Sequence, residues 1–490
     1  MMHFLKNVSI FLIAYLVFLI ILFAISANNN KYLLIGYILI SIEFIIFVIL
    51  YYVQYISVTD KIAKILSFSF ITYIIHLLVV LPLSLMFISN NLEFAGLQKS
   101  VLTVIRVLIT LQLYILIIFF LIKVFKKNRL KIQKIFLVFL LSIIISLIIP
   151  VPYLQVKFIY FLNSFVPMFL ILFILTHLLL LKERFNIQKS FKKYLNPTLT
   201  VVIGFILISY IFGLILYFNK WEVFDIGTLY SLKGYQPIEG LPRSWWAQIE
   251  NIAFIRFPIT LENPIVAGYL SAFLSMIMIY FSKYILAFLF FIFTIFSFSK
   301  AAIIYLFLYM VIIISSRLSF IFKKIFLKIF NSITMITLLI IAYLGLQMGI
   351  SAILKTSASI HLLGLTLPFI SMGEYSFIEI LCGHGIGSGG NFLKAAMGSQ
   401  IGFIEWLESG SESGIGSIFF QLGLLGLLSI IVISYRIILL LQTIEAKFIY
   451  FFYFTSMFIQ EDLINNNLLL LMFFTIIIIE FNQKKRLSNE

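Results

Sequence analysis

The sequence predicts an all-α, polytopic integral membrane protein, and its composition and hydropathy pattern support this. Of the 490 residues, 62% are hydrophobic and 11% are charged, and the mean hydropathy is +1.14. Soluble chains carry about 25% charged residues, so a water-soluble fold of this composition would leave much apolar surface in water. Apolar runs long enough to cross a bilayer recur along the chain. We expect a single membrane domain over residues 1–490.

Apolar runs along the chain are candidate transmembrane helices. The runs at 135–149, 284–299, 301–316 and 448–460 are short for a full crossing, so we expect about 12 to 14 spans. The full set covers residues 8–26, 32–57, 65–88, 101–122, 135–149, 158–181, 199–218, 264–281, 284–299, 301–316, 329–350, 414–435, 448–460 and 468–481.

The distribution of basic residues predicts the orientation in the membrane. Clusters of Lys and Arg lie at residues 123–134, 182–193, 317–328 and 484–486. With fourteen crossings all of these clusters fall on one side, which the positive-inside rule assigns to the cytoplasm together with both termini. Two large loops, 219–263 and 351–413, then lie outside. The net charge of +16 reflects this topology and does not indicate nucleic-acid binding.

The cysteine and tryptophan contents limit the kinds of site that we expect. The single cysteine, Cys382, excludes an internal disulfide and a cysteine-based metal site. The outer loops show no metal-binding motif, so we expect neither a metal nor a cofactor. All four tryptophans lie in the two large outer loops. Trp245 and Trp246 belong either to an aromatic belt at the lipid headgroups or to a sugar or lipid contact at the mouth of a site.

The second outer loop concentrates Gly, Ser, His and carboxylates. Its run GHGIGSGG at 383–390 permits positive φ angles and lets backbone N–H groups approach an anion closely. Gly385 and Gly387 are therefore candidates for substrate binding. His384 is either a structural residue of the loop or a catalytic one. Residues 401–408 (IGFIEWLE) have helical spacing and predict an amphipathic helix resting on the membrane surface.

Glu412 is the candidate catalytic acid. The break at Ser409-Gly410-Ser411 indicates that Glu412 begins the following span, at its outer mouth. A carboxylate at that position can act as a base or orient a hydroxyl nucleophile. Ser413, which follows it, is a candidate for substrate binding.

Three cations lie where a phosphate could be bound. Arg256 lies at the end of the first outer loop, where it suits bidentate phosphate binding or a salt bridge within the loop. Lys300 lies at the outer end of a helical hairpin, against the positive-inside trend. Arg106 lies within the span 101–122, and charges inside a membrane usually face a cavity or a partner.

Three features in the second half of the chain resemble those of a known family. They are the segment from Arg256 through Asn263-Pro264 to Gly268-Tyr269-Leu270, the hairpin Ser299-Lys300-Ala301-Ala302, and the second-loop glycines 383, 385 and 387 followed by Glu412-Ser413-Gly414 and the turn 421–426. Their order, beside two large outer loops, resembles the O-antigen polymerase/ligase superfamily, and most closely its Wzy-type repeat-unit polymerases. Lys300 stands where the family usually has arginine.

The resemblance implies a GT-C-like membrane glycosyltransferase in the bacterial cytoplasmic membrane. Its substrate would be an oligosaccharide linked to undecaprenyl pyrophosphate, and its partners membrane lipid, a chain-length regulator and a flippase. Arg256, Lys300 and Arg106 would hold the pyrophosphate, and Glu412 would position or deprotonate the acceptor hydroxyl. An acid–Ser pair stands at 412–413 where ligases carry His-Asn, which favours a polymerase. A ligase-type glycan transferase and a lipid-linked oligosaccharide flippase remain alternatives.

Overall fold

The computed structural model describes most of the residues between 133 and 482, and α3 before them. The described residues are 58–75, 133–151, 160–184, 187–218, 252–258, 264–318, 357–391, 402–458, 460–461 and 466–482, with short strands between 237 and 249 and isolated positions between 114 and 126 and at 154, 157 and 393. These residues are largely helical, as the sequence predicts. The helices are α3 (Val58–Ile75), α6 (Ile135–Ile148), α8 (Val166–Arg184), α9 (Gln188–Phe218), α11 (Pro264–Tyr280), α12 (Tyr284–Phe296), α13 (Lys300–Leu318), α16 (Ser357–Ile370), α17 (Phe377–Cys382), α19 (Phe403–Glu408), α20 (Gly414–Leu440), α21 (Ile444–Ser456) and α22 (Asn466–Phe481).

Several predicted spans agree closely with helices of the structure. Helices α6, α11, α12, α13, α20 and α22 begin within about two residues of the predicted starts, because apolar runs set their limits. Helix α9 begins at Gln188 and α3 at Val58, both before the predicted starts, since each helix continues into polar sequence. The predicted spans 8–26, 32–57 and 329–350, and most of 101–122, lie outside the described residues.

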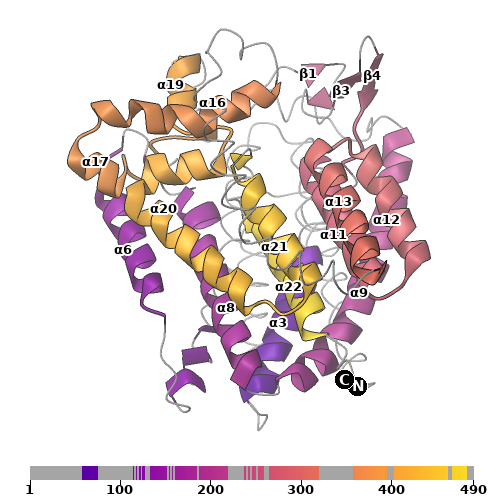
Figure 1. Ribbon diagram of the computed structural model, residues 1–490. Helices are drawn as coiled ribbons and strands as arrows, with labels where there is room; N and C mark the ends of the chain where they lie inside the picture. Colours follow the sequence, from indigo (N-terminus) through magenta and orange to yellow (C-terminus); the bar gives the residue numbers. More distant parts are fainter. Residues whose placement is uncertain are drawn as a thin grey trace, which may run out of the picture.

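Three of the described helices are long and apolar enough to cross a membrane. They are Phe161–Lys182, Gln188–Ile215 and Gly414–Leu440. The helices stand side by side, with α6, α8 and α20 on one flank, α21 and α22 in the middle, and α9 and α11–α13 on the other flank (Figure 1). Helices α16–α19 and the strands β1–β4 gather at one end of this bundle (Figure 1). We name this the loop end.

Helices α8, α20 and α22 run in the same direction. At the loop end, the hydroxyl of Tyr160, just before α8, donates to Glu461, just before α22, and the Ser417 hydroxyl near the start of α20 lies 3.5 Å from the same carboxylate oxygen. At the opposite end, Lys182 Nζ lies 2.5 Å from Glu480 Oε1, and the backbone that follows α20 also donates to Glu480. Parallel helices here are compatible with spans six, twelve and fourteen of the predicted order. The side of the membrane that each end faces stays a prediction.

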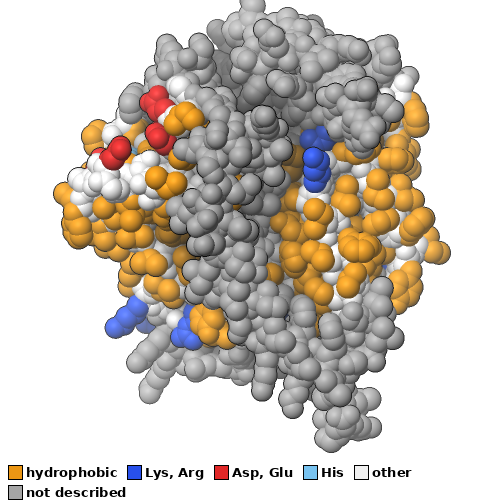
Figure 2. Space-filling view, turned by 45° about the horizontal axis from the view of Figure 1, so that its top comes forward, with side chains coloured by type: hydrophobic (Ala, Val, Ile, Leu, Met, Phe, Trp, Pro, Cys, Tyr) orange, Lys and Arg blue, Asp and Glu red, His pale blue; other side chains and the backbone are white. Residues whose placement is uncertain are grey.

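The flanks of the bundle present apolar side chains outward. Leu137, Leu141 and Ile148 of α6 are 64%, 53% and 75% exposed, and Ile285 and Phe288 of α12 are 88% and 63% exposed. Apolar side chains cover the sides of the molecule in Figure 2, whereas acidic side chains appear at the loop end. Contiguous exposed apolar surface is unfavourable in water but suits contact with lipid. This surface fits a membrane protein.

The predicted first outer loop, residues 219–263, contains short strands, which the all-α prediction did not include. Strand β1 (Pro237–Ile238) pairs with β2 (Leu241–Pro242), and β3 (Trp246–Ile249) pairs with β4 (Ile252–Ile255), both antiparallel. These pairs hold only a small part of the described chain. The second hairpin ends at Ile255, so Arg256 follows it directly and lies at the C-terminal end of α12.

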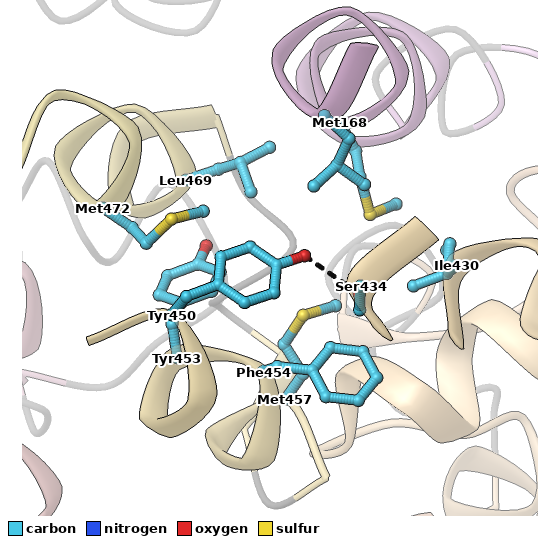
Figure 3. A pocket seen from close by; sticks show the side chains of 10 residues that line it. Met168, Ile430, Ser434, Tyr450, Tyr453, Phe454, Met457, Leu469 and Met472 are labelled. Carbon is cyan, nitrogen blue, oxygen red and sulfur yellow. Dashed lines mark hydrogen bonds between the residues drawn. The ribbon is translucent and has the colours of Figure 1, made fainter. Parts of the chain in front are cut away.

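A small cavity lies inside the bundle between α8, α20, α21 and α22 (Figure 3). Its volume is about 10 Å³, and its lining includes Met168, Leu172 and Met472. The Tyr450 hydroxyl donates across it to Ser434 Oγ at 3.0 Å. A space of this size holds about one water molecule. A sugar does not fit there.

Candidate functional site at the loop end

Glu412 lies in the short connection between α19 and α20, just before the span that it was predicted to begin. Helix α19 ends at Glu408 and α20 begins at Gly414, so the carboxylate lies beside the N-terminus of a long apolar helix. Its backbone has φ +68°, the left-handed conformation that side chains with a Cβ avoid. Such a residue costs about 1 to 3 kcal/mol unless its surroundings enforce the conformation, and these residues cluster at functional sites.

His361 of α16 is the nearest described partner of Glu412. Its Nδ1 lies 3.2 Å from Glu412 Oε2 and 3.1 Å from the Glu412 backbone oxygen. The two side chains are 26% and 28% exposed. His361 was not among the predicted site residues, because residues 357–370 were predicted to lie in a loop. The available signal was Gly364, which lies one helical turn after His361 and therefore shares its face.

Close backbone packing holds the Glu412 connection against α16. A Cβ built on Gly364 would overlap the backbone oxygen of Ser411 and lie 3.6 Å from the Glu412 Cβ. Gly416 approaches the Gly364 backbone in the same way. The absence of a side chain at Gly364 therefore lets His361 reach Glu412.

We expect Gly364→Ala to separate α16 from the Glu412 connection. Inserting a methyl group into packed backbone should lower the free energy of unfolding by about 1 to 3 kcal/mol. Thermal unfolding in detergent measures this change. Gly204→Ala and Gly373→Ala are matched controls, because nothing lies within 4 Å of the added Cβ at either position. Equal melting temperatures for Gly364→Ala and the controls would contradict the close packing.

Ser413 caps α20. Its side chain is fully buried, and its Oγ accepts a hydrogen bond from the Gly416 N–H at 3.0 Å. An N-cap of this kind satisfies one of the unpaired amides at a helix start. The structure therefore gives Ser413 a structural role in place of the predicted substrate contact.

The glycine-rich run folds back onto α20 through its own amides. Gly383, Gly385, Gly387 and Gly390 all have positive φ, which confirms that the glycines permit this loop conformation. The Gly387 N–H donates to Gln421 Oε1 at 2.8 Å. Gly385 and Gly387 are both buried. The amide of Gly387 is thus used within the protein, and the geometry does not support the predicted anion contact by these two glycines.

The glycine-rich run packs against a break in α20 at Gly423. Gly423 has φ +65°, and its Cα lies against the backbone of Leu381 and Gly383. A helix break leaves carbonyl groups without helical partners. Here the His384 N–H donates to Phe420 O at 2.8 Å, and Ser146 Oγ donates to Gln421 O at 2.5 Å. The glycine run and the break in α20 therefore form one packed unit.

His384 is packed into this unit by aromatic rings. Its imidazole stacks on Phe420 at 4.3 Å and meets the edge of Tyr375 at 4.5 Å. Nδ1 lies 3.5 Å from Glu379 Oε1, and Nε2 is buried without a hydrogen-bond partner among the described residues. Burial lowers the pKa of His384, and the nearby Glu379 partly opposes this. The environment favours the structural alternative of the two predicted for His384.

Glu461 is a buried carboxylate that was not among the predicted site residues. It holds the glycine-rich run and the start of α20 together. Glu461 is 5% exposed, accepts from Tyr160, and lies 3.5 Å from Ser417 Oγ. Its other oxygen accepts from the Asn391 N–H at 2.8 Å. Ser417 accepts in turn from Gln421 Nε2 at 2.8 Å, which continues the chain of hydrogen bonds to the glycine loop. The signal available was an acid in a short connection between two apolar spans.

Arg256 and Lys300 lie at one hairpin. Arg256 Nε donates to Ser297 O at 2.9 Å and Nη2 to Phe298 O at 3.3 Å, while Phe257 N donates to Phe296 O at 2.9 Å. Burial lowers the pKa of Arg256, although a guanidinium keeps its charge in proteins. Lys300, exposed, is the first residue of α13. Figure 2 shows basic side chains at this end of the α11–α13 unit.

Trp406, the fourth tryptophan of the chain, is a core residue of the loop end. Trp406 and Leu407 of α19 are 5% and 0% exposed and pack with Leu363 and Leu367 of α16. The predicted helix at 401–408 is confirmed as α19, in which Trp406 and Leu407 pack against α16 while Ile404 stays 44% exposed. Trp246 lies in β3, whereas Arg106 and Trp245 lie outside the described residues.

The structure thus joins Glu412 to His361 and Arg256 to the Lys300 hairpin. Both groups lie at the loop end. The described residues contain no group of His, Cys, Asp and Glu side chains that could hold a metal ion. Comparison of the chain with protein-family models, with curated proteins and with solved structures gave no match.

Proposed function

We propose that this chain is a membrane glycosyltransferase that polymerises oligosaccharide repeat units carried on undecaprenyl pyrophosphate. The growing glycan is transferred from its lipid pyrophosphate to a hydroxyl of an incoming repeat unit, at the outer face of the bacterial cytoplasmic membrane. The product is an O-antigen, a capsular polysaccharide or an exopolysaccharide. Chain-length control and delivery of repeat units fall to a regulator and a flippase.

The observation that carries the proposal is the setting of Glu412. A carboxylate in a strained backbone conformation, partly exposed and paired with a histidine, lies at the mouth of an apolar helix. A lipid-linked sugar would be presented near such a helix end, because its lipid lies in the membrane and its glycan lies in water. The Glu412–His361 pair serves there to bind and activate the acceptor hydroxyl.

The cations at the other hairpin support the leaving-group half of the reaction. Negative charge develops on the pyrophosphate as the glycosidic bond breaks, and fixed cations stabilise it. Lys300 is exposed at the start of α13, and Arg256 is held beside it by two backbone carbonyls. Lys300 is the more accessible of the two, so it contacts the pyrophosphate most directly. Arg256 contributes its charge and fixes the hairpin.

Deletion of the gene followed by gel analysis of surface glycan tests the proposal. A polymerase deletion leaves capped single repeat units and removes the ladder of longer chains. Restoration of the ladder by the wild-type gene is the control. Loss of all capped glycan would contradict the proposal, since it is the result expected for a flippase or a ligase. An unchanged ladder would contradict it as well.

A further inference from the structure

The imidazole of His361 has a tautomer that its surroundings determine. Its Nδ1 faces two oxygens of Glu412, the carboxylate Oε2 at 3.2 Å and the backbone oxygen at 3.1 Å. A backbone oxygen only accepts hydrogen bonds, and so does an ionised carboxylate. Nδ1 therefore carries the hydrogen. In the neutral ring the lone pair, and with it the basic site, is then on Nε2.

The basic nitrogen of His361 is available to a ligand. The side chain is 26% exposed, and no described residue forms a hydrogen bond with Nε2. The other two described histidines differ. His177 is 1% exposed among phenylalanine rings, and the Nε2 of His384 is buried. Among the histidines that the structure describes, only His361 combines a carboxylate on one nitrogen with an accessible second nitrogen.

We propose that His361 is the general base of the transfer and that Glu412 acts through it as a positioning residue. This assignment rests on the proposed function. A base whose second nitrogen is held by a carboxylate is the arrangement that activates hydroxyl nucleophiles in many enzymes. The strained backbone of Glu412 suits this arrangement, because both its carboxylate and its backbone oxygen lie toward His361 Nδ1.

The step balances without a further reactant. His361 Nε2 takes the proton of the acceptor hydroxyl as its oxygen forms a bond to the anomeric carbon of the growing glycan. The bond from that carbon to the pyrophosphate oxygen breaks, and its electron pair leaves with the lipid pyrophosphate. The Glu412 carboxylate stabilises the imidazolium that results. The proton then passes to the leaving group or to water, which restores the neutral ring.

The test uses full-length protein in lipid nanodiscs with a lipid-pyrophosphate-linked repeat unit and follows chain length on gels. His361→Asn keeps an amide donor toward Glu412 but lacks a basic nitrogen. We expect its maximal rate to fall by at least about 100-fold, with little change in KM for the acceptor, because general bases contribute about 10²–10⁴ to the rate. We expect added imidazole to raise the rate of His361→Ala at least about tenfold. Thermal unfolding verifies that both variants are folded.

The outcomes separate this inference from the proposed function. Polymer from the wild type, together with a rate for His361→Asn above about a tenth of the wild-type rate, would overturn the role of His361 alone. Failure of imidazole to raise the rate of folded His361→Ala would overturn it too. Absence of polymer from the folded wild type would overturn the proposed function and this assignment together.

Discussion

We expect Glu412→Gln to abolish chain extension while the amount of folded protein stays unchanged. Glutamine has nearly the shape of glutamate and can adopt the same strained backbone, but it cannot stabilise a positive charge on His361. The loss should reach about 10²- to 10⁴-fold in rate, the contribution of general acid–base groups. The measurement is the length distribution of surface glycan in cells that carry the variant, with immunoblotting for protein level.

A matched control separates this effect from a general loss of acidic charge. Glu374 also lies at the loop end but is exposed. Glu374→Gln should therefore leave the glycan ladder intact. Normal chain length in the Glu412→Gln variant would remove Glu412 from the mechanism.

Replacing Glu412 with glycine should abolish activity without lowering the free energy of unfolding. Glu412 costs about 1 to 3 kcal/mol in its left-handed conformation, and glycine adopts that conformation freely. Glu412→Gly should therefore be at least as stable as the wild type and yet inactive. A residue that lowers stability but is required for activity is expected at functional sites.

Glu480→Gln should strongly destabilise the opposite end of the bundle. The Lys182 and Glu480 side chains are 2% and 0% exposed and lie 2.5 Å apart. Glu480 also accepts from the Thr443 hydroxyl at 2.6 Å and from two backbone N–H groups. Removing one charge of a buried pair leaves the other without its counter-charge and costs about 3 to 5 kcal/mol. Thermal unfolding in detergent should show a large drop in melting temperature.

The double variant Lys182→Met, Glu480→Gln tests the cause. With both charges of this pair removed, neither side chain is left as a buried charge without the other, and the second substitution should recover part of the stability lost in the first. Additive losses in the double variant would contradict the ion pair as the source of the effect.

The helices of the bundle could be predicted from sequence because apolar runs are local. The starts of α6, α11 and α12 agree with prediction for this reason. The prediction of α16 failed because Ser357–Ile370 is a short apolar stretch within a loop, and its helical form depends on packing against α19 and α20. Propensity alone does not decide such a segment.

The candidate site could be predicted only in part. Glu412 followed from its position beside a helix start, whereas its partner His361 lies 51 residues away. The glycine run attracted attention through its composition, but its amides bind α20, which no local pattern reveals. Contacts between distant segments depend on the fold, so the chemistry of a loop cannot be inferred from its composition alone.

The hydrogen bonds at the two ends of α8 have a consequence for biosynthesis. Tyr160 and Glu461 are 301 residues apart, and Lys182 and Glu480 are 298 residues apart. Proteins are synthesised from the N-terminus, so α8 is made long before either carboxylate exists. The segment from Glu461 to the end of α22 therefore completes these polar contacts at the two ends of α8 only after it has been synthesised. A chain that stops before residue 461 lacks both carboxylates, so neither contact can form at the ends of its α8.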